Sequence, residues 1–500
     1  MSQEHETKGF LRTVERLGNA LPHPAMIFVI LSLILIIISH FTAGTTVTYY
    51  DAMKEQDVTV EAVSLMNQEG LRYMFNHAVR NFTNFAPLGI VLVAMLGVGV
   101  SEHSGLIGTA LKRLLHGAGG AYLSYLVVFA GIISNLASDA GYVVVIPLGM
   151  IIFANAGKHP IAGLAAAFAG VSAGFSANLI FGPTDAMLAG ITNQALVSGG
   201  IDAQISAASN WYFLIASTFL LTLVGGYITN KFISPNLGQY EGEYKPDDRP
   251  LTDLELKGLK RAGIALIAVV VLMLLLMFPK NAPFRSVNAT GEKTLEEFIN
   301  NGLIPMVLVI FAIPGLVYGK TVGSIKNNKD FVGTMTKGME SMAGFLVLAF
   351  FAAQFVAYFG ETKLGLILSV KGAEAIEATN LSGLPLILVF ILVSAFLNLF
   401  IGSASAKWAI MAPIFLPMMA RSGIAPEVTQ IAYRIGDSTT NIITPLMNYF
   451  AMIVIFMQRY DKERGIGTLI STMLPYSISF LISWSALMTI WYKLGIPFGQ

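Results

Sequence analysis

Long apolar stretches alternate with short polar loops along the whole chain, and this pattern predicts a membrane protein with many spans. A helix rises about 1.5 Å per residue, so a hydrocarbon core of about 30 Å takes roughly 20 apolar residues to cross. Nine segments approach that length, and we expect a transmembrane helix in each. They lie at 21–43, 84–101, 160–190, 210–232, 261–279, 301–319, 343–359, 426–457 and 468–492.

Two further apolar stretches, 119–157 and 381–421, each carry a polar centre. Residues 134–139 form the centre of the first, and Asn398 with 402–408 forms that of the second. Polar groups in the middle of an apolar run are costly in lipid unless the backbone turns there inside protein or beside water. We therefore expect two re-entrant hairpins, each entering and leaving on one side of the membrane.

The positions of the basic residues test this layout, because Lys and Arg prefer cytoplasmic loops next to span ends. Arg12 and Arg16 predict a cytoplasmic N-terminus. Counting nine spans and two hairpins from there places the other basic clusters in the cytoplasm, and counting either hairpin as a full crossing would invert every later loop. These clusters lie at 112–113, 158, 231–261, 320–337 and 459–464.

A weak internal repeat supports the same layout. A shift of 266 positions superposes several helix-breaking or polar residues: Pro147 on Pro413, Pro160 on Pro426, Gly170 on Gly436, Ser172 on Ser438 and Tyr142 on Trp408. We expect a first repeat at 1–235, a connecting segment at 236–300 and a second repeat at 301–500, related by inversion as in many alternating-access transporters.

The amino-acid composition agrees with a membrane protein and argues against several other classes of function. Of the 500 residues, 54% are hydrophobic and 12% are charged, about half the charged fraction of an ordinary soluble domain. The net charge is +1 and no basic tract stands out, which argues against nucleic-acid binding. The chain has no cysteine, which excludes disulfides and thiolate chemistry. We expect a multi-pass protein of an inner membrane.

A polar run follows the second hairpin. It spans 433–441, contains Arg434 and Asp437, and is followed by Pro445. The run Gly, Asp, Ser, Thr, Thr and Asn at 436–441 makes a poor helix interior, so we expect an unwound loop there. Its oxygens would hold a cation, and the flanking helix ends would face a charged substrate. The alternative is a kinked helix with satisfied polar groups.

The first half has a corresponding run with fewer polar residues at 170–178, followed by Gly182 and Asp185. Its small residues suit close helix packing, whereas Asp185, Asp139 and Asp437 are candidate buried acids, with a structural ion pair as the alternative for each. We expect no organic cofactor, and Na⁺ as a candidate coupling ion. Its candidate ligands are Ser134, Asn135, Ser138, Asp139, Asn178, Asn398, Ser403, Asp437, Ser438, Thr439 and Asn441.

Lys407 and Arg434 are the cations expected at membrane depth. One would neutralise an anionic substrate while the other pairs with Asp437, and the residues alone leave the assignment open. Lys407 could instead extend to an interface. Trp408 suits stacking on an aromatic ring, although packing against the protein is an equal alternative.

One short motif is also found in serine hydrolases. Residues 170–174 match the G-x-S-x-G pattern of a serine nucleophile, Ser172. The expected strand-turn-helix context is missing, and all seven histidines lie in predicted loops or near span ends. Intramembrane hydrolysis is therefore a remote alternative.

The polar hairpin centres, the run 436–441 with Pro445, the segment 406–413 and the Gly-Pro-Thr-Asp sequence at 182–185 together resemble the p-aminobenzoyl-glutamate transporter (AbgT) family. The likeness extends over nearly the whole chain and includes members described as sulfonamide exporters. It implies a homodimer with nine spans and two hairpins per subunit. Family functional positions fall on Asp185, Ser405, Trp408, Pro426, Arg434, Asp437 and Pro445.

The resemblance implies secondary active transport of p-aminobenzoyl-glutamate, export of sulfonamides, or both. Trp408 would recognise the aromatic ring and Arg434 the acid. The sequence leaves the direction and the coupling ion, H⁺ or Na⁺, open. The fold also resembles that of sodium-coupled dicarboxylate transporters, so a dicarboxylate symporter is the main alternative, and an ion channel is a further one.

Overall fold

The structure is a computed structural model of the chain. It describes residues 24–51, 56–115, 122–137, 141–238, 240, 250–287, 293–295, 297–379, 381–445, 447, 449–462 and 464–500.

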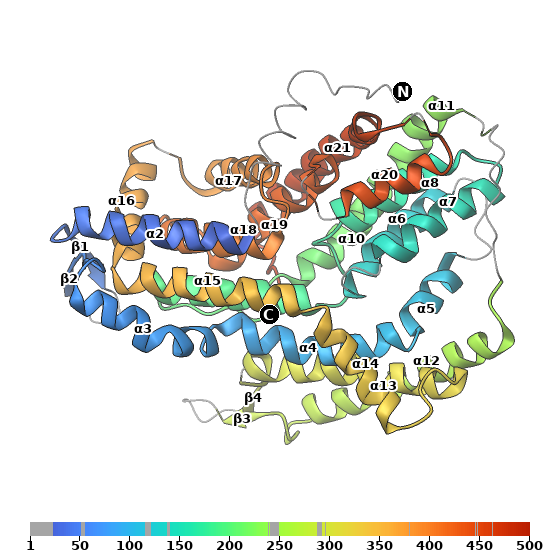
Figure 1. The fold of residues 1–500 in the computed structure, drawn as a ribbon, viewed down its shortest axis with the longest axis horizontal. Helices are drawn as coiled ribbons and strands as arrows, with labels where there is room; N and C mark the ends of the chain where they lie inside the picture. The colour runs from blue at the N-terminus through green and yellow to red at the C-terminus, as the bar shows by residue number, and fades with distance from the viewer. Residues whose placement is uncertain are drawn as a thin grey trace.

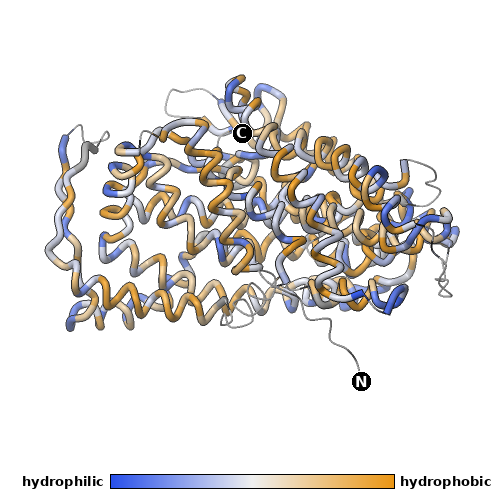
Figure 2. The backbone as a smooth tube through the Cα atoms, turned by 90° about the horizontal axis from the view of Figure 1, so that it is seen from above, coloured by the Kyte–Doolittle hydropathy of each residue, from blue (hydrophilic) through white to orange (hydrophobic). Residues whose placement is uncertain are grey.

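Seven stretches of helix in this described part are long and apolar enough to cross a membrane. Each overlaps one of the nine expected spans, and the helices are coloured as hydrophobic along most of their length in Figure 2. They are α2 (Pro24–Thr42), α3 with α4 (Gln68–Thr83 and Ala86–His103), α10 with η5 and α11 (Trp211–Ile228, Thr229–Ile233 and Ser234–Leu237), α12 (Asp253–Met277), α13 (Leu303–Val322), α15 (Ala343–Glu361) and α21 (Ile466–Lys493).

The other two expected spans are broken helices. The first consists of α8 (Pro160–Phe168), the π-helical turn η4 (Ala169–Ala173) and, after a non-helical stretch, α9 (Pro183–Ser198). The second consists of α19 (Pro426–Thr440), the 3₁₀ turn η7 (Asn441–Ile443) and α20 (Phe450–Gln458). Because no single helix crosses in either place, the total of nine spans stays a prediction.

Both expected hairpins are pairs of apolar helices joined at a polar break. The first pair is α6 (Leu123–Ser134), ending in the 3₁₀ turn η2 (Asn135–Ala137), and the π-helical turn η3 (Gly141–Val145) running into α7 (Ile146–Asn155). The second is α17 (Gly383–Asn398) and α18 (Ala404–Arg421). Each hairpin is followed by a broken helix and a long helix, so the order of elements recurs. The repeat limits and the inversion stay predictions.

Several short elements were not expected. Additional helices lie in segments assigned to loops, and two small antiparallel β-hairpins interrupt an otherwise helical fold. Asn67 and Asn327 begin α3 and α14 because each side chain accepts a hydrogen bond from the third backbone N–H of its helix. These elements are α5 (Leu106–Leu115), α14 (Asn328–Glu340), α16 (Leu364–Ala378), η6 (Phe298–Gly302), β1 (Thr46–Asp51), β2 (Gln56–Glu61), β3 (Ser286–Val287) and β4 (Lys293–Thr294).

The elements form groups around the two broken helices. In Figure 1, α2, α15 and α18 run along one side, and α6, α7, α8, α10 and α20 gather on the other. Along the lower edge of that view, α4 packs against α13, and α13 packs against α12. Helix α19 lies between the two sides, packed against α17 and α21.

In each broken helix, one glycine allows close packing against the first helix of the preceding hairpin. A Cβ at Gly170 would lie 2.3 Å from the carbonyl oxygen of Val128 on α6, and one at Gly436 would lie 2.4 Å from that of Ile391 on α17. Both contacts are with backbone, which cannot swing aside. The shift of 266 positions superposes these glycines, so the two halves use equivalent residues for the same close packing.

We predict that Gly170→Ala and Gly436→Ala destabilise the fold, because overpacking costs about 1–3 kcal/mol. Gly89→Ala on α4 is the control, since no atom lies within 4 Å of its added methyl group. Thermal unfolding of the purified protein should show lower midpoints for the first two variants and no loss for the control. Equal midpoints in all three would contradict the packing argument.

Candidate functional site

Helix α19 carries the charged centre of the site. Arg434 and Asp437 lie one turn apart and are about 98% and 99% buried. The expectation that 436–441 is unwound is wrong for its first five residues, which are α-helical through Thr440. Thr439 and Thr440 donate their hydroxyl hydrogens to the carbonyl oxygens four residues earlier, so these side chains are satisfied within the helix.

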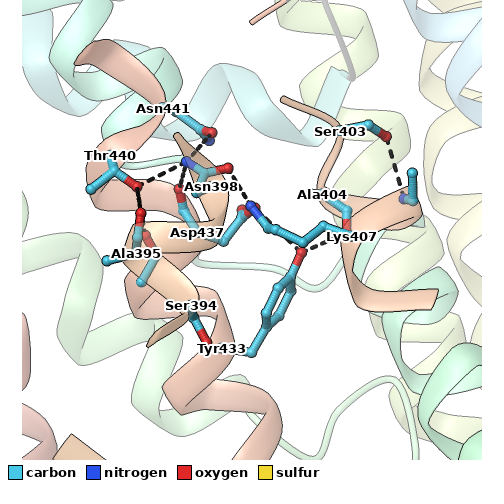
Figure 3. Close-up of polar contacts among 12 residues, drawn as sticks. Ser394, Ala395, Asn398, Ser403, Ala404, Lys407, Tyr433, Asp437, Thr440 and Asn441 are labelled. Carbon is cyan, nitrogen blue, oxygen red and sulfur yellow. Dashed lines mark hydrogen bonds and ion pairs between the residues drawn. The ribbon is translucent and has the colours of Figure 1, made fainter. Parts of the chain in front are cut away.

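Asp437 pairs with the second hairpin. The Lys407 ammonium, on α18, lies 2.5 Å from Asp437 Oδ1 and also donates to Asn398 Oδ1 at the end of α17 (Figure 3). Lys407 is fully buried, so it does not extend to an interface. A buried ammonium is tolerated only with partners of this kind. The structure thus assigns Lys407, rather than Arg434, to Asp437.

Asn398 joins the hairpin to the end of α19. Its amide nitrogen lies 2.7 Å from the carbonyl oxygen of Asp437 and 2.9 Å from both Thr440 Oγ1 and Asn441 Oδ1. An amide has two N–H groups, so three oxygens share two hydrogens. Tyr433 closes the other side: its hydroxyl donates to the carbonyl oxygen of Ala404 at 2.5 Å and lies 3.3 Å from Asp437 Oδ1 (Figure 3).

Arg434 pairs with the first half of the chain. Its Nη2 lies 2.7 Å from Asp185 Oδ1 and donates to the carbonyl oxygen of Ser176 at 3.1 Å. Asp185 also accepts a 2.6 Å hydrogen bond from the Gly182 backbone N–H, which caps α9. Pro183 and Asp185 therefore start a helix at the break and hold a carboxylate at its N-terminus.

Trp408 is buried between the two halves. Its ring stacks on Tyr433 with centroids 4.5 Å apart, and its Nε1 donates to Thr192 Oγ1 at 3.0 Å. Gln430 donates to the same hydroxyl oxygen at 2.9 Å. In this conformation the indole is fully covered by protein, so a ligand ring reaches it only if the surrounding helices move.

Several buried polar atoms of the first hairpin, the first broken helix and α19 have no hydrogen-bond partner. Within the described residues, buried side-chain atoms with no hydrogen-bond partner include both amide atoms of Asn135, the hydroxyls of Ser172 and Ser176, Asn178 Oδ1 and the Ser438 hydroxyl. Asn441 donates to the Ser172 carbonyl oxygen, which ties the two breaks together. Ser138 and Asp139, two of the candidate Na⁺ ligands, lie outside the described residues.

The remaining candidates have local roles in helix geometry. Ser134 and Thr439 donate to carbonyl oxygens of their own helices. Ser403 caps α18 by accepting from the Ala406 N–H, and Ser405 lies beside it, with the two hydroxyl oxygens 3.3 Å apart. Pro426 is the first residue of α19, and Pro445 follows the break after η7.

Two polar residues of the site were missed. The Thr192 hydroxyl oxygen accepts from the Trp408 indole N–H and from the Gln430 amide, yet neither Thr192 nor Gln430 was singled out from the sequence. Gln430 precedes Arg434 by four residues on α19, and that spacing would have placed both on one face of a helix. Thr192 offered no comparable signal.

Comparison with known proteins identifies the family. The family model of the AbgT transporters matches residues 9–500. The chain belongs to the AbgT transporter family. It is 36% identical over 486 residues to the p-aminobenzoyl-glutamate transport protein of Escherichia coli (strain K12), covering 97% of this chain and 95% of that one.

Two solved structures of similar transporters share the fold. The YdaH transporter of Alcanivorax borkumensis is 45% identical, with a TM-score of 0.88 over 96% of this chain and 100% of that one. MtrF of Neisseria gonorrhoeae, described with a class of antimetabolite efflux pumps, is 44% identical, with a TM-score of 0.90 over 97% and 98% of the chains.

The AbgT chain is therefore a polytopic membrane transporter and not an enzyme. Ser172 agrees with this assignment, because it lies in a π-helical turn of a broken helix. The described strands form only the two small hairpins, at 46–61 and 286–294, so Ser172 has no strand-turn-helix context.

We predict that Lys407→Met destabilises the fold more than the double variant Lys407→Met/Asp437→Asn does. Removing one partner of a buried ion pair leaves an unpaired charge and costs about 3–5 kcal/mol, whereas removing both is often close to neutral. Lys371→Met, on the exposed side of α16, is the matched control. Thermal unfolding checks the order, and a double variant no more stable than Lys407→Met would contradict it.

Proposed function

We propose that this transporter moves p-aminobenzoyl-glutamate and related p-aminophenyl compounds, including sulfonamides, across the membrane by ion-coupled alternating access. The E. coli relative is named for p-aminobenzoyl-glutamate transport, and MtrF is described with antimetabolite efflux pumps. The residues at the centre of the fold supply groups of matching chemistry.

The Arg434–Asp185 contact carries the proposal. A guanidinium at membrane depth needs an anionic partner, and Asp185 supplies it from the other half of the chain. Arg434 Nε has no hydrogen-bond partner among the described residues. The guanidinium therefore keeps an unused N–H with which to meet a second carboxylate, and its planar fork suits two-point binding of that group.

A substrate carboxylate competes with Asp185 for Arg434 in this mechanism. When the substrate binds, the guanidinium exchanges one anion for another and remains neutralised throughout. The break between η4 and α9 holds Asp185 at a helix start, so a shift of α9 relative to α19 separates the pair. Exposure of Trp408 by the same movement would offer an aromatic surface to the p-aminophenyl ring.

The coupling ion is H⁺ or Na⁺. Lys407 places a fixed positive charge among Asn398, Asp437 and Tyr433, so the second hairpin already holds a cation there. Free oxygens at Asn135 and Asn178 favour the first half as the Na⁺ site. A proton on Asp185 would instead neutralise the carboxylate and release Arg434 to the substrate.

Three properties complete the proposal. The protein acts as a homodimer in a bacterial inner membrane, and its N-terminus is cytoplasmic. Exposed apolar side chains on α12 suit lipid or a second copy, and the basic residues within 231–261 and 320–337 support the orientation. Light scattering of the purified protein and labelling of Asn236→Cys with an impermeant reagent test these points.

Counterflow in proteoliposomes tests the function. Labelled p-aminobenzoyl-glutamate, a sulfonamide and succinate are compared, with Na⁺ and pH gradients imposed separately. We expect saturable exchange of the two p-aminophenyl compounds that depends on one gradient. Exchange of succinate alone would support a dicarboxylate symporter, and flux without saturation or coupling would support a channel.

We predict that Arg434→Lys reduces transport of p-aminobenzoyl-glutamate at least tenfold although the positive charge is kept. An ammonium cannot make the two parallel hydrogen bonds that a guanidinium makes with a carboxylate. Arg459→Lys, at the exposed end of α20, is the control and should transport normally. Counterflow with both purified variants decides the matter, and full activity of Arg434→Lys would remove the guanidinium from substrate binding.

We predict that Trp408→Ala weakens binding of p-aminophenyl ligands by on the order of 1 kcal/mol more than binding of an aliphatic dicarboxylate. Trp408→Phe, which keeps an aromatic face and loses the hydrogen bond with Thr192, should retain most of that preference. Calorimetry on the purified variants measures both. Equal losses for aromatic and aliphatic ligands would limit Trp408 to packing against Tyr433.

A further inference from the structure

A polar cavity lies apart from the two buried ion pairs of the central site. It has a volume of about 240 Å³, and it opens between α3, the start of α4, α9 and α15. Its polar lining consists of Tyr73, His77, Arg80, Asn81, Asn84 and Gln194. Ligand pockets are typically about 300–1,000 Å³, so this cavity suits a small ligand or one end of a larger one.

The charged lining of the cavity is positive, which suits an anion. Arg80 is its permanent cation, and no carboxylate is among its lining residues or paired with Arg80 in the described part of the chain. His77 Nδ1 lies 3.2 Å from the Tyr73 carbonyl oxygen, which leaves Nε2 free of that contact. A carboxylate here would meet a guanidinium and neutral amide groups, and none of the described lining residues is acidic. Glu361, which is not a lining residue, interacts electrostatically with Tyr73.

Hydrogen bonds between α3 and α15 support one side of the cavity, and two aromatic rings lie at its edge. Asn81 donates to Gln354 Oε1 at 3.0 Å, and the buried Gln354 donates to the Ala78 carbonyl oxygen at 2.9 Å, so α15 holds α3 in place. The rings of Tyr73 and His77 stack with centroids 4.6 Å apart. Carboxylate-binding groups next to a flat aromatic surface match an aryl compound that carries an acid.

Helix α9 connects this cavity to the central site. Gln194 lines the cavity, and Thr192, two residues earlier, holds Trp408 and Gln430. Asp185, near the start of the same helix, pairs with Arg434. At about 1.5 Å per residue, roughly 13 Å of helix separates Gln194 from Asp185. One rigid element thus carries a residue of each site.

We propose that this cavity is a second binding site for the acidic aryl substrate, used on the way to or from the central site. The inference rests on the proposed function for the identity of its ligand. Arg80 holds the carboxylate, and the Tyr73–His77 pair contacts the ring. Because α9 carries both Gln194 and Asp185, a movement of α9 changes both sites together.

Charge-selective labelling tests the site without relying on transport, and the chain has no native cysteine. Asn84→Cys places a thiol at the exposed mouth of the cavity, and Asn76→Cys places one on α3 outside it. Each variant is treated in detergent with an anionic and a cationic methanethiosulfonate. We expect the ratio of anionic to cationic labelling rates to be at least threefold higher for Asn84→Cys. Adding Arg80→Gln should remove that difference, and adding Arg72→Gln should not.

Ligand protection and kinetics then identify the occupant. p-Aminobenzoyl-glutamate should slow labelling of Asn84→Cys and leave Asn76→Cys unchanged, and Arg80→Gln should raise KM for its transport several-fold with little change in the maximal rate. Equal labelling ratios at the two positions would overturn the anion site, and a charge preference without protection would overturn its assignment to this ligand. If p-aminobenzoyl-glutamate slows labelling of Asn84→Cys but the protein does not transport it, the cavity still binds the ligand and the proposed function is refuted instead.

Discussion

The pairing of two charges one turn apart on α19 with opposite halves of the chain is the constraint on which the rest of the site depends. Arg434 meets Asp185 from the first half, and Asp437 meets Lys407 from the second hairpin. All four side chains are nearly or fully buried. Since an unpaired buried charge costs several kcal/mol, α19 cannot move away from either half unless something else neutralises the charge that is left.

The breaks in the two helices make this pairing possible. A continuous helix would keep its carbonyl oxygens in its own hydrogen bonds, whereas the break after η4 lets the Ser176 carbonyl accept from Arg434. The same break provides the helix start at which Asp185 is held by the Gly182 N–H. Irregular backbone is tolerated at membrane depth where protein covers it, and here it supplies partners for the buried charges.

Apolar length and polar interruptions predicted seven spans that the described helices match and the pair of apolar helices in each expected hairpin, because a hydrocarbon core imposes those features on any chain. The position of the second break was predicted less well. Local propensity favoured unwinding at Gly436, but that glycine packs against Ile391, and the following threonines bond to their own helix. Tertiary packing outweighed propensity, so the helix continues to Thr440. The Arg434–Asp185 pair was not predicted, since no local pattern relates residues from different halves.

The helical form of α19 has a consequence for transport that an unwound loop would not have. On a helix the spacing between Arg434 and Asp437 is fixed at about one turn, so the two charges move together. The Asp437 pair is also tied to Asn398 and Tyr433, whereas the Asp185 pair joins two separate broken helices. Each pair has two supporting hydrogen bonds, but those of the Asp437 pair tie the second hairpin to α19, whereas those of the Asp185 pair lie within the first broken helix and its contact with Arg434. In the proposed mechanism a substrate carboxylate replaces Asp185 at the junction with α9, while Lys407 keeps Asp437 neutralised and the second hairpin supports the site.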